Sequence, residues 1–285
     1  MKKVCLLLAA LTMVFTLASC GDTAKSSSVQ QSGGAQESTS TQLSGKVSTG
    51  GSTSVEKVIG ALSEAYMAQN SKVTVTYDPT GSGAGITGAM DGSLDIGLSS
   101  RNLKDGESGI TATPFALDGI AIVVNKANAI NDISLDTLAK IAKGEITNWK
   151  ELGGKDEQIV FIGREAGSGT RDGFETIVKV KDECKYSEEL TATGAIIGKV
   201  QANTAAIGYA SLASVDDKIK ALTVEGTAPS EATVQDGTYK LQRPFLILTK
   251  ENTEQSAAVK SFIDFATNKA NAEIIANAGA VPMAK

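Results

Sequence analysis

The sequence of 285 residues contains no histidine. Without histidine, the chain cannot form a Ser-His-Asp triad, a Cys-His catalytic pair or a metal site with imidazole ligands. Three common classes of enzyme and metal site are therefore excluded before any motif is considered.

Cysteine is scarce, with three residues at positions 5, 20 and 184. Cys5 and Cys20 lie in the first twenty residues, so a chain cleaved before Cys20 keeps Cys184 as its one thiol in the folded body and has no disulfide there. Cys184 stands in the charged stretch "KVKDECKYSEEL" without a histidine nearby. We interpret it as an incidental residue and not as a nucleophile.

A surplus of positive charge is missing as well, because 27 Lys and Arg residues face 32 Asp and Glu residues, a net charge of −5. A net negative chain has no positive electrostatic potential to attract nucleic acid, and its sequence shows no stripe of basic and aromatic residues. We therefore exclude nucleic acid as a partner. The hydrophobic content of 41% suffices for one large or two medium domains with real cores. Any anion that binds must be held by local geometry.

The first twenty residues, "MKKVCLLLAALTMVFTLASC", combine two lysines, a short apolar run and small residues before a cysteine, as export signals do. The segment "LASC" resembles the lipobox of bacterial lipoproteins, which implies a signal peptide over residues 1–19 and a palmitate-bearing Cys20. An uncleaved anchor helix is the alternative, although the apolar run is short for one. Residues 20–45, rich in Ser, Gln and Gly, are predicted to hold the lipidated cysteine and a flexible tether.

From residue 46 onward, short β-branched runs alternate with segments of helical period, which favours an α/β architecture with sheets covered on both faces. The predicted strands are 72–77, 119–125, 158–163, 207–210, 221–224 and 244–249. Apolar residues at helical spacing predict helices within 54–70 and 256–279. In such folds, ligands lie beyond the carboxyl ends of strands, against the N-termini of helices.

Three turns rich in Gly, Ser and Thr precede helical segments: "STGGSTS" (48–54), "PTGSGAG" (79–85) and "REAGSGTRDGF" (164–174). A helix start offers unpaired backbone N–H groups and a partial positive charge, so each turn suits an oxyanion. The alternative is that Ser52, Thr53, Ser82, Ser168 and Thr170 are ordinary helix N-caps. Capping requires neither the flanking glycines nor the arginines of the third turn.

A nucleotide site is not supported, because none of the three turns matches G-x-x-x-x-G-K-[ST] or G-x-G-x-x-G. Ser54 and Lys57 match the S-x-x-K spacing of penicillin-recognising hydrolases, but no S-D-N or K-T-G motif accompanies them. We therefore disfavour both a nucleotide-binding protein and a serine hydrolase of that kind.

The motifs "REAGSGTRDGFE", "LAKIAKGEITNWKELGG" (138–154), "TGGSTSVEKV", "TGSGAGI" and "IGLSSRNL" together resemble the substrate-binding lipoproteins of phosphate ABC transporters, over residues 46–285. The resemblance implies a periplasmic-binding-protein-like fold of type II: two α/β lobes joined by two crossover strands, with the ligand cleft between them. Chain order suggests that 46–122 and 248–285 form lobe one and that 123–247 form lobe two.

The resemblance also implies the residues that bind phosphate. Thr53, Ser54 and Ser82 provide donors from lobe one, and Arg164 is the cleft arginine. Ser168, Gly169 and Thr170 form the helix start of lobe two. Ser100 is expected at the site, and weaker expectations fall on Ser52, Arg101 and Arg171, the last of which could instead pair with Asp172 or Glu175.

One departure concerns the proton of HPO₄²⁻. Better-known members of the family carry an aspartate after the Gly-x-Ser of the motif "IGLSSRNL", where this chain has Ser100 and Arg101. That aspartate accepts the proton and so rejects fully ionised sulfate. Our hypothesis is that Asp118, at the start of a predicted crossover strand, takes this role; a turn residue before a strand is the alternative.

These observations lead to one expected function, with no catalytic residues, no cofactor and no metal. The chain is expected to be a bacterial lipoprotein on the extracytoplasmic face of the cell membrane, which captures inorganic phosphate (HPO₄²⁻ or H₂PO₄⁻) and delivers it to ABC transporter permease subunits. Alternatives are a binder of another tetrahedral oxyanion such as sulfate or molybdate, a surface hydrolase of phosphate esters, and an adhesive or signalling lipoprotein that has lost the site.

Overall fold

The computed structural model describes residues 43–283, which lie within one compact unit, Thr41–Lys285. The predicted signal peptide, Cys20 and nearly all of the predicted tether lie outside the described residues. Within the described range, no helix has the length and apolar character needed to cross a bilayer.

Ten strands form one mixed sheet, in the order β2-β1-β3-β11-β4-β8-β6-β7, with β9 and β12 both paired with β4. Their bounds are β1 (Gly45–Gly51), β2 (Val73–Asp78), β3 (Ile96–Ser99), β4 (Ile110–Asn125), β6 (Val160–Arg164), β7 (Glu188–Leu190), β8 (Ala206–Ser211), β9 (Ile219–Ala221), β11 (Gln242–Lys250) and β12 (Val281–Pro282). A separate two-stranded sheet pairs β5 (Asp132–Ile133) with β10 (Thr223–Val224).

Eight α-helices and three short 3₁₀ helices occur in the described range. The α-helices are α1 (Glu56–Gln69), α2 (Ser82–Asp91), α3 (Leu135–Ala142), α4 (Gly169–Val178), α5 (Thr193–Ala202), α6 (Glu231–Gln235), α7 (Ala257–Thr267) and α8 (Ala272–Asn277). The 3₁₀ helices are η1 (Trp149–Leu152), η2 (Leu212–Ser214) and η3 (Lys269–Asn271).

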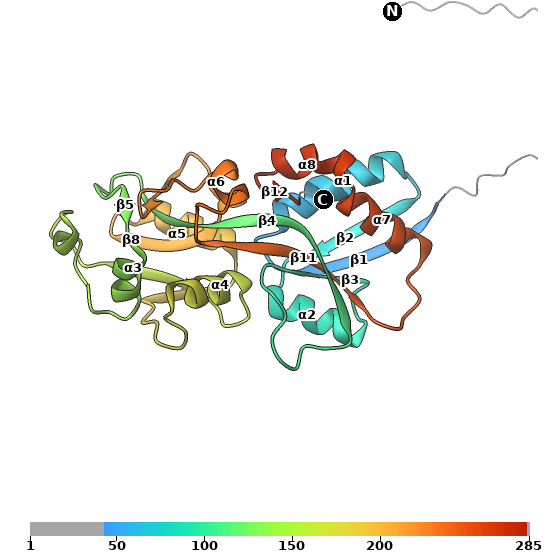
Figure 1. The fold of residues 1–285 in the computed structure, drawn as a ribbon, viewed down its shortest axis with the longest axis horizontal. Coiled ribbons are helices and arrows are strands. Elements are labelled where there is room, and N and C mark those ends of the chain that lie inside the picture. Colours follow the sequence, from blue (N-terminus) through green and yellow to red (C-terminus); the bar gives the residue numbers. More distant parts are fainter. Residues whose placement is uncertain (1–42, 284–285) are drawn as a thin grey trace, which may run out of the picture. The chain divides into compact units, whose positions relative to one another are not determined.

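Two strands connect the two halves of the large sheet. The long strand β4 pairs with β11 and β12 through its first part and with β8 and β9 through its second part. β11 lies antiparallel beside β4, and Figure 1 shows the two running together between the halves. The first half contains β1, β2 and β3 with α1, α2, α7 and α8; the second contains β6, β7 and β8 with α3, α4 and α5. The predicted lobe boundaries at residues 122 and 248 fall within β4 and β11.

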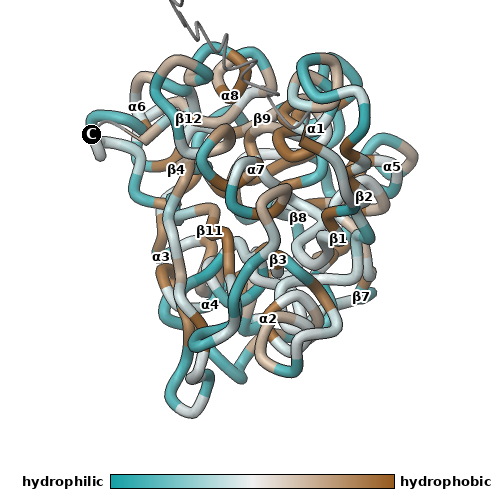
Figure 2. The backbone as a smooth tube through the Cα atoms, turned by 90° about the vertical axis from the view of Figure 1, so that its right-hand side faces the viewer, coloured by the Kyte–Doolittle hydropathy of each residue, from teal (hydrophilic) through white to brown (hydrophobic). Residues whose placement is uncertain are grey.

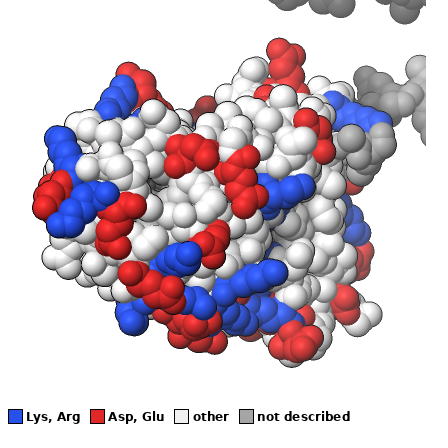
Figure 3. All heavy atoms as spheres, turned by 60° about the vertical axis from the view of Figure 1, so that its left-hand side comes forward, with Lys and Arg blue, Asp and Glu red and all other residues white. Residues whose placement is uncertain are grey.

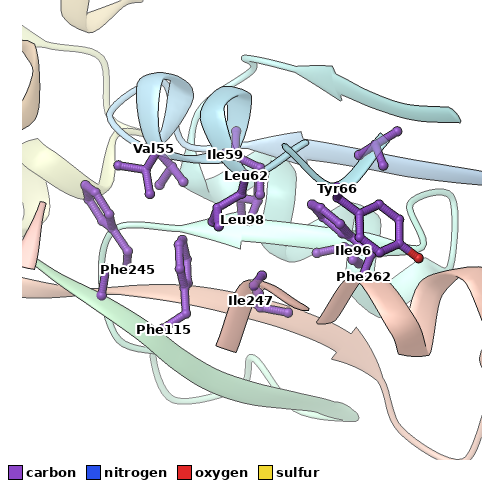
Figure 4. Packing of buried hydrophobic residues seen from close by; sticks show 14 of the residues in the cluster. Val55, Ile59, Leu62, Tyr66, Ile96, Leu98, Phe115, Phe245, Ile247 and Phe262 are labelled. Atoms are coloured by element: carbon purple, nitrogen blue, oxygen red, sulfur yellow. The ribbon is translucent and has the colours of Figure 1, made fainter. Parts of the chain in front are cut away.

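Each half has its own hydrophobic core. In the first half, Ile59 and Leu62 of α1, and Val55 directly before it, point toward residues of β3, β4 and β11 (Figure 4). In the second half, the rings of Phe174 and Tyr209 stack with centroids 4.3 Å apart. Hydrophobic residues concentrate in the interior strands and helices, and hydrophilic residues in the connecting loops (Figure 2). A second, smaller hydrophobic cluster lies in each half as well, so both halves bury apolar side chains independently of each other.

The C-terminal helix predicted over 256–279 is divided in the structure. α7 ends at Thr267, and Asn268 has extended dihedral angles of φ −78° and ψ 129°. The side chain of Asn268 accepts a hydrogen bond from the backbone N–H of Ala270 and so caps η3, which precedes α8. An asparagine side chain can form such local hydrogen bonds in place of the helical ones and so end a helix. The spacing of apolar residues does not detect this break, and it therefore predicted one continuous helix.

Candidate anion-binding site

Seven buried hydroxyl side chains meet between the two halves of the sheet. We call them the hydroxyl cluster: Ser52, Thr53, Ser54, Ser82, Ser100, Thr170 and Thr193. Ser100 is hydrogen-bonded to Ser52 at 2.7 Å and to Ser82 at 3.2 Å. Each of the seven side chains is at most 4% exposed, so their polar atoms face each other and not bulk solvent. Such a concentration of buried polar groups is costly unless it serves a ligand or a tight network.

Members of the cluster join the two halves directly. Ser54 at the start of α1 is hydrogen-bonded to Thr170 of α4 at 2.8 Å and to Thr193 of α5 at 3.1 Å. Thr53 contacts Thr193 at 3.0 Å. The backbone N–H of Gly83 in α2 donates to the carbonyl of Gly167 before α4 at 3.0 Å. The cluster is therefore assembled only when the two halves approach each other.

The cluster lies at the carboxyl ends of parallel strands, where α/β sheets bind ligands. Residues 52–54 follow β1, Ser100 follows β3, and Arg164 ends β6. Helices α1, α2, α4 and α5 begin beside these strand ends, each with at least ten residues. The N-terminus of an α-helix carries a partial positive charge and free N–H groups, so four such ends favour an anion.

Five residues were considered as possible helix N-caps in the sequence analysis, and the structure shows this role for one of them. Ser168 caps α4, and its Oγ accepts from the N–H groups of Thr170 and Arg171. Helices α1 and α2 have no side-chain cap bond, and Ser52 and Ser82 instead bond to Ser100. The remaining hydroxyls thus serve the cluster and not helix termination.

Arg164 is the cation of the site, with a side chain that is 2% exposed. Its Nη1 donates to Thr193 Oγ1 and its Nη2 to Thr53 Oγ1, both at 3.1 Å. Glu165 pairs with it, accepting from Nε and Nη2 at 3.1 Å. The guanidinium fork therefore lies inside the cluster, in the planar geometry that suits phosphate, while its ion-pair partner Glu165 is 28% exposed.

Thr193 was missed by the sequence analysis. It begins α5, and its backbone N–H donates to Thr53 Oγ1 at 3.2 Å. The segment "TATG" at 191–194 has the same Gly and Thr character as the three recognised turns, directly before an apolar helical run. That likeness is the signal that could have identified it.

Gly169 permits the close contact between α4 and the first half. A Cβ atom at this position would lie 2.5 Å from Ser82 Oγ and 2.6 Å from Ser100 Oγ. Both distances are below normal contact, so any side chain at residue 169 would push these hydroxyls away. Glycine is therefore required at position 169 by the close packing against Ser82 and Ser100, and not by its place in the helix.

Asp118 lies at the junction of β4 and β11, in a buried ion pair. Arg243 Nη2 donates to its Oδ2 at 2.9 Å, and Ser211 Oγ donates to its Oδ1 at 2.8 Å. Burial raises the pKa of Asp118, and the Arg243 guanidinium partly offsets this effect. Among the described residues, neither carboxylate oxygen forms a hydrogen bond with the hydroxyl cluster. Asp118 thus lies within β4, and not in a turn before a strand, and both of its oxygens already accept hydrogen bonds.

Two further arginines named from the sequence bond to carboxylates. Arg101 makes two hydrogen bonds with Glu107, at 2.6 and 2.7 Å. Arg171 bonds to Glu175 at 2.7 Å, one of the two alternative partners considered, and to Glu189 at 2.9 Å. Arg171 Nη1 also donates to the backbone carbonyl of Arg164 and so helps to fix the backbone at that residue.

A cavity of about 380 Å³ borders the cluster at Thr53 and Thr193, with Lys57 and Lys218 also in its lining. Acidic and basic side chains are interspersed over the face shown in Figure 3, without a large area of one sign. An anion would therefore be attracted by the site itself and not by a charged face.

Two observations concern metal-ligating and thiol groups within residues 43–283. Residues 43–283 contain no group of three or more His, Cys, Asp or Glu side chains arranged to hold a metal ion. Burial raises the pKa of the Cys184 thiol to about 11, so almost none is thiolate at neutral pH. Trp149 is buried in the core of the second half, as expected of a packing residue.

Comparison with known proteins places the chain. Residues 36–270 match the family model described as a PBP superfamily domain. The phosphate-binding protein PstS of Bacillus subtilis is 31% identical over 294 residues, which cover 99% of this chain and 95% of the relative. The chain belongs to the PstS family. The PstS protein of Borreliella burgdorferi is 32% identical over 247 residues, covering 82% of this chain and 88% of the relative.

A solved structure, with phosphate bound, also resembles this PstS-family chain. It is of a Clostridium perfringens protein assigned as a phosphate ABC transporter substrate-binding protein. The two are 40% identical with a TM-score of 0.82, over 84% of this chain and all of the other. The predicted α/β fold, periplasmic-binding-protein-like and of type II, is confirmed.

Proposed function

We propose that this PstS-family protein captures inorganic phosphate in the hydroxyl cluster and delivers it to the permease subunits of an ABC transporter, without chemical change to the ligand. The observation that carries the proposal is the convergence of the cluster, Arg164 and four helix N-termini between the two halves. Kinship with phosphate-binding PstS proteins supports the choice of phosphate among tetrahedral anions.

The electrostatics of the cluster fit a doubly charged anion. Each helix N-terminus carries the equivalent of roughly +0.5 charge, so four of them amount to about +2, the magnitude of the charge on HPO₄²⁻. Arg164 and Glu165 balance each other. Hydroxyl groups can both donate and accept, so the cluster can satisfy three unprotonated phosphate oxygens and one protonated oxygen together.

The proposed ligands come from both halves. Thr53, Ser54, Ser82 and Ser100 belong to the first half, with Ser52 beside them; Arg164, Ser168, Gly169, Thr170 and Thr193 belong to the second. Because the ligand contacts both sets only when the halves are close together, binding favours the closed arrangement. Arg101 and Arg171, which bond to carboxylates, are proposed to shape the site and not to contact the ion.

The direct test is calorimetry of the full chain, purified in mild detergent and freed of phosphate, against phosphate, sulfate and molybdate. Phosphate is expected to bind with a Kd far below about 1 mM, which corresponds to −4.1 kcal/mol. Tighter binding of sulfate or molybdate would make the protein a carrier of that ion, and release of phosphate from esters would make it a hydrolase. No binding below about millimolar would defeat the proposal and leave an adhesive or signalling role.

We further propose that Cys20 is lipidated after cleavage of residues 1–19 and that the tether holds the folded part at the extracytoplasmic face of the bacterial membrane. The "LASC" motif supports this. With Cys20→Ala, the protein is expected to move from the membrane fraction to the soluble fraction while its phosphate affinity stays unchanged. Equal membrane retention of both forms would contradict lipidation at this residue.

Closure is expected to gain a small contribution from one ion pair at the edge of the site. Lys104, in the loop after β3, pairs with Asp172 of α4 at 2.5 Å, across the two halves. Both side chains are partly exposed, so the pair contributes about 0.2–1 kcal/mol. Lys104→Gln should weaken phosphate binding by up to about fivefold in calorimetry, and less at high salt.

The matched control for Lys104 is Lys140→Gln, because the partner of Lys140 is Asp136 in the same helix, α3. This variant removes a comparable exposed pair without touching the contact between the halves. A loss of affinity equal in the two variants would show that the Lys104 pair does not act through closure.

A further inference from the structure

Arg243, on β11, is a second buried arginine beside the site. Its side chain is 3% exposed, and it donates to Asp118 Oδ2 from Nη2 at 2.9 Å and from Nε at 3.3 Å. Its Nη1 is buried and has no hydrogen-bond partner among the described residues. A buried charged donor without an acceptor is unfavourable, so a bound acceptor such as an anion oxygen would stabilise this atom.

The glycine face of α4 places Arg243 next to the hydroxyl cluster. Residues 169 and 173 are four apart and share one face of the helix, one turn of about 5.4 Å from each other. A Cβ at Gly169 would meet Ser82 and Ser100, whereas a Cβ at Gly173 would lie 3.6 Å from Arg243 Cδ. The arginine therefore lies against the same helix face as the cluster, about one turn further along.

A second contact links Arg243 to the core of the first half. Its guanidinium carbon lies 5.8 Å from the centre of the Phe245 ring. Phe245 and Val55 belong to one core cluster and point toward each other in Figure 4. Val55 directly follows Ser54, so Phe245 links the guanidinium to the core residue next to the cluster.

The two buried guanidiniums influence each other. Burial lowers the pKa of Arg243, Asp118 acts in the opposite sense, and the positive charge of Arg164 lowers it further. Like charges separated by low-dielectric protein repel, and an anion placed between them relieves that repulsion.

We propose that Arg243 is a further ligand of the bound anion, whose Nη1 donates to an anion oxygen, and that Asp118 is a positioning residue that fixes this guanidinium through Nη2 and Nε. The proposal rests on the proposed function, since it assumes that phosphate occupies the hydroxyl cluster. It gives the site cations from two different strands, Arg164 from β6 and Arg243 from β11.

The test compares phosphate affinity with stability in variants of the full chain, by calorimetry and by urea unfolding. Arg243→Lys keeps an ammonium for Asp118 but removes the spare donor, and it is expected to bind phosphate about tenfold more weakly with nearly unchanged stability. Arg243→Gln is expected to lose about 10- to 100-fold in affinity, together with stability, because Asp118 is left as an unpaired buried charge.

The double variant Asp118→Asn/Arg243→Gln separates the two roles, since it replaces the ion pair with two neutral amides. Its stability is expected to recover relative to Arg243→Gln while its phosphate affinity stays low. Tyr239→Phe is the matched control: it removes a nearby buried hydrogen bond, from Tyr239 to the carbonyl of Ile120, without changing a charge. It should lose some stability and keep wild-type affinity.

Wild-type phosphate affinity in Arg243→Lys, or recovery of affinity along with stability in the double variant, would overturn the role of Arg243 as a ligand. These results leave the proposed function intact, because the wild-type chain still binds phosphate. If the wild-type chain does not bind phosphate, the proposed function and this inference fall together.

Discussion

Replacing Arg164 with glutamine is expected to weaken phosphate binding by at least about 100-fold. The guanidinium lies within the hydroxyl cluster, and its Nη1 and Nη2 donate to Thr193 and Thr53. In the complex, Nη1 and Nη2 are expected to donate to phosphate oxygens. Each such charge-assisted hydrogen bond is worth about 1.5–3 kcal/mol, and each 1.4 kcal/mol is a factor of ten in Kd. Titration calorimetry of the phosphate-free variant measures the effect.

The comparison that isolates the geometry of Arg164 is Arg164→Lys. Lysine keeps the positive charge but offers a point charge in place of the planar fork, so an intermediate loss of about tenfold is expected. Glu165 is 28% exposed and can be hydrated without its partner. The carbonyls of Leu190 and Thr191 lose a donor in Arg164→Gln, so a stability loss of about 1–3 kcal/mol is expected there and is measured separately by urea unfolding. Affinity within threefold of wild type in Arg164→Gln would remove this arginine from the site.

The second large effect is expected from a single added methyl group, Gly169→Ala. Its Cβ would lie 2.5 and 2.6 Å from the hydroxyl oxygens of Ser82 and Ser100, which belong to the opposite half of the sheet. Because the side chains are already packed against α4, the halves must separate to accommodate the methyl group, and overpacking of this kind costs about 1–3 kcal/mol. Phosphate affinity should fall by about 5- to 150-fold.

The control for Gly169 is Gly198→Ala in α5, where the added Cβ has no neighbour within 4 Å. Alanine is the better helix former, so this variant should be equal to or slightly more stable than the wild type, by up to about 1 kcal/mol, with unchanged phosphate affinity. If Gly169→Ala bound phosphate as tightly as Gly198→Ala, the packing of α4 against Ser82 and Ser100 would not control closure.

Local patterns predicted those elements whose sequence is itself regular. The predicted strand at 244–249 lies within β11, and that at 207–210 within β8, because β-branched and apolar runs favour buried strands. β1, with the sequence "GKVSTGG", was not predicted as a strand, because its three glycines lower β propensity and read as a turn. Its strand conformation comes from pairing with β2 and β3, which only the tertiary structure reveals.

The site divides in the same way. Serines and threonines near helix starts were predicted from short motifs and the family resemblance, and the structure brings Thr53, Ser54, Ser82, Ser100 and Thr170 together. Arg243 was not predicted, because its partner Asp118 is 125 residues away and the pairing arises from the register of β4 with β11. Asp118 was predicted at the start of a strand, but it lies within β4, and nothing in its neighbours indicated that Ser211 and Arg243 would occupy its oxygens.

The discrimination between phosphate and sulfate follows from these contacts. Ser100 lies in the hydroxyl cluster where the better-known relatives are expected to have a carboxylate, and a hydroxyl can turn from acceptor to donor. A carboxylate cannot make that change, so it rejects sulfate more strongly. We therefore expect phosphate to bind more tightly than sulfate, by a smaller affinity ratio than a free carboxylate in the site would give.

The central claim is that phosphate is held in the hydroxyl cluster, between the two halves of the sheet. A crystal structure of the protein with phosphate tests it most directly. Phosphate oxygens are expected within hydrogen-bonding distance of Thr53, Ser54, Arg164 and Thr170, from both halves at once. Phosphate bound elsewhere, or contacting residues of one half alone, would contradict it.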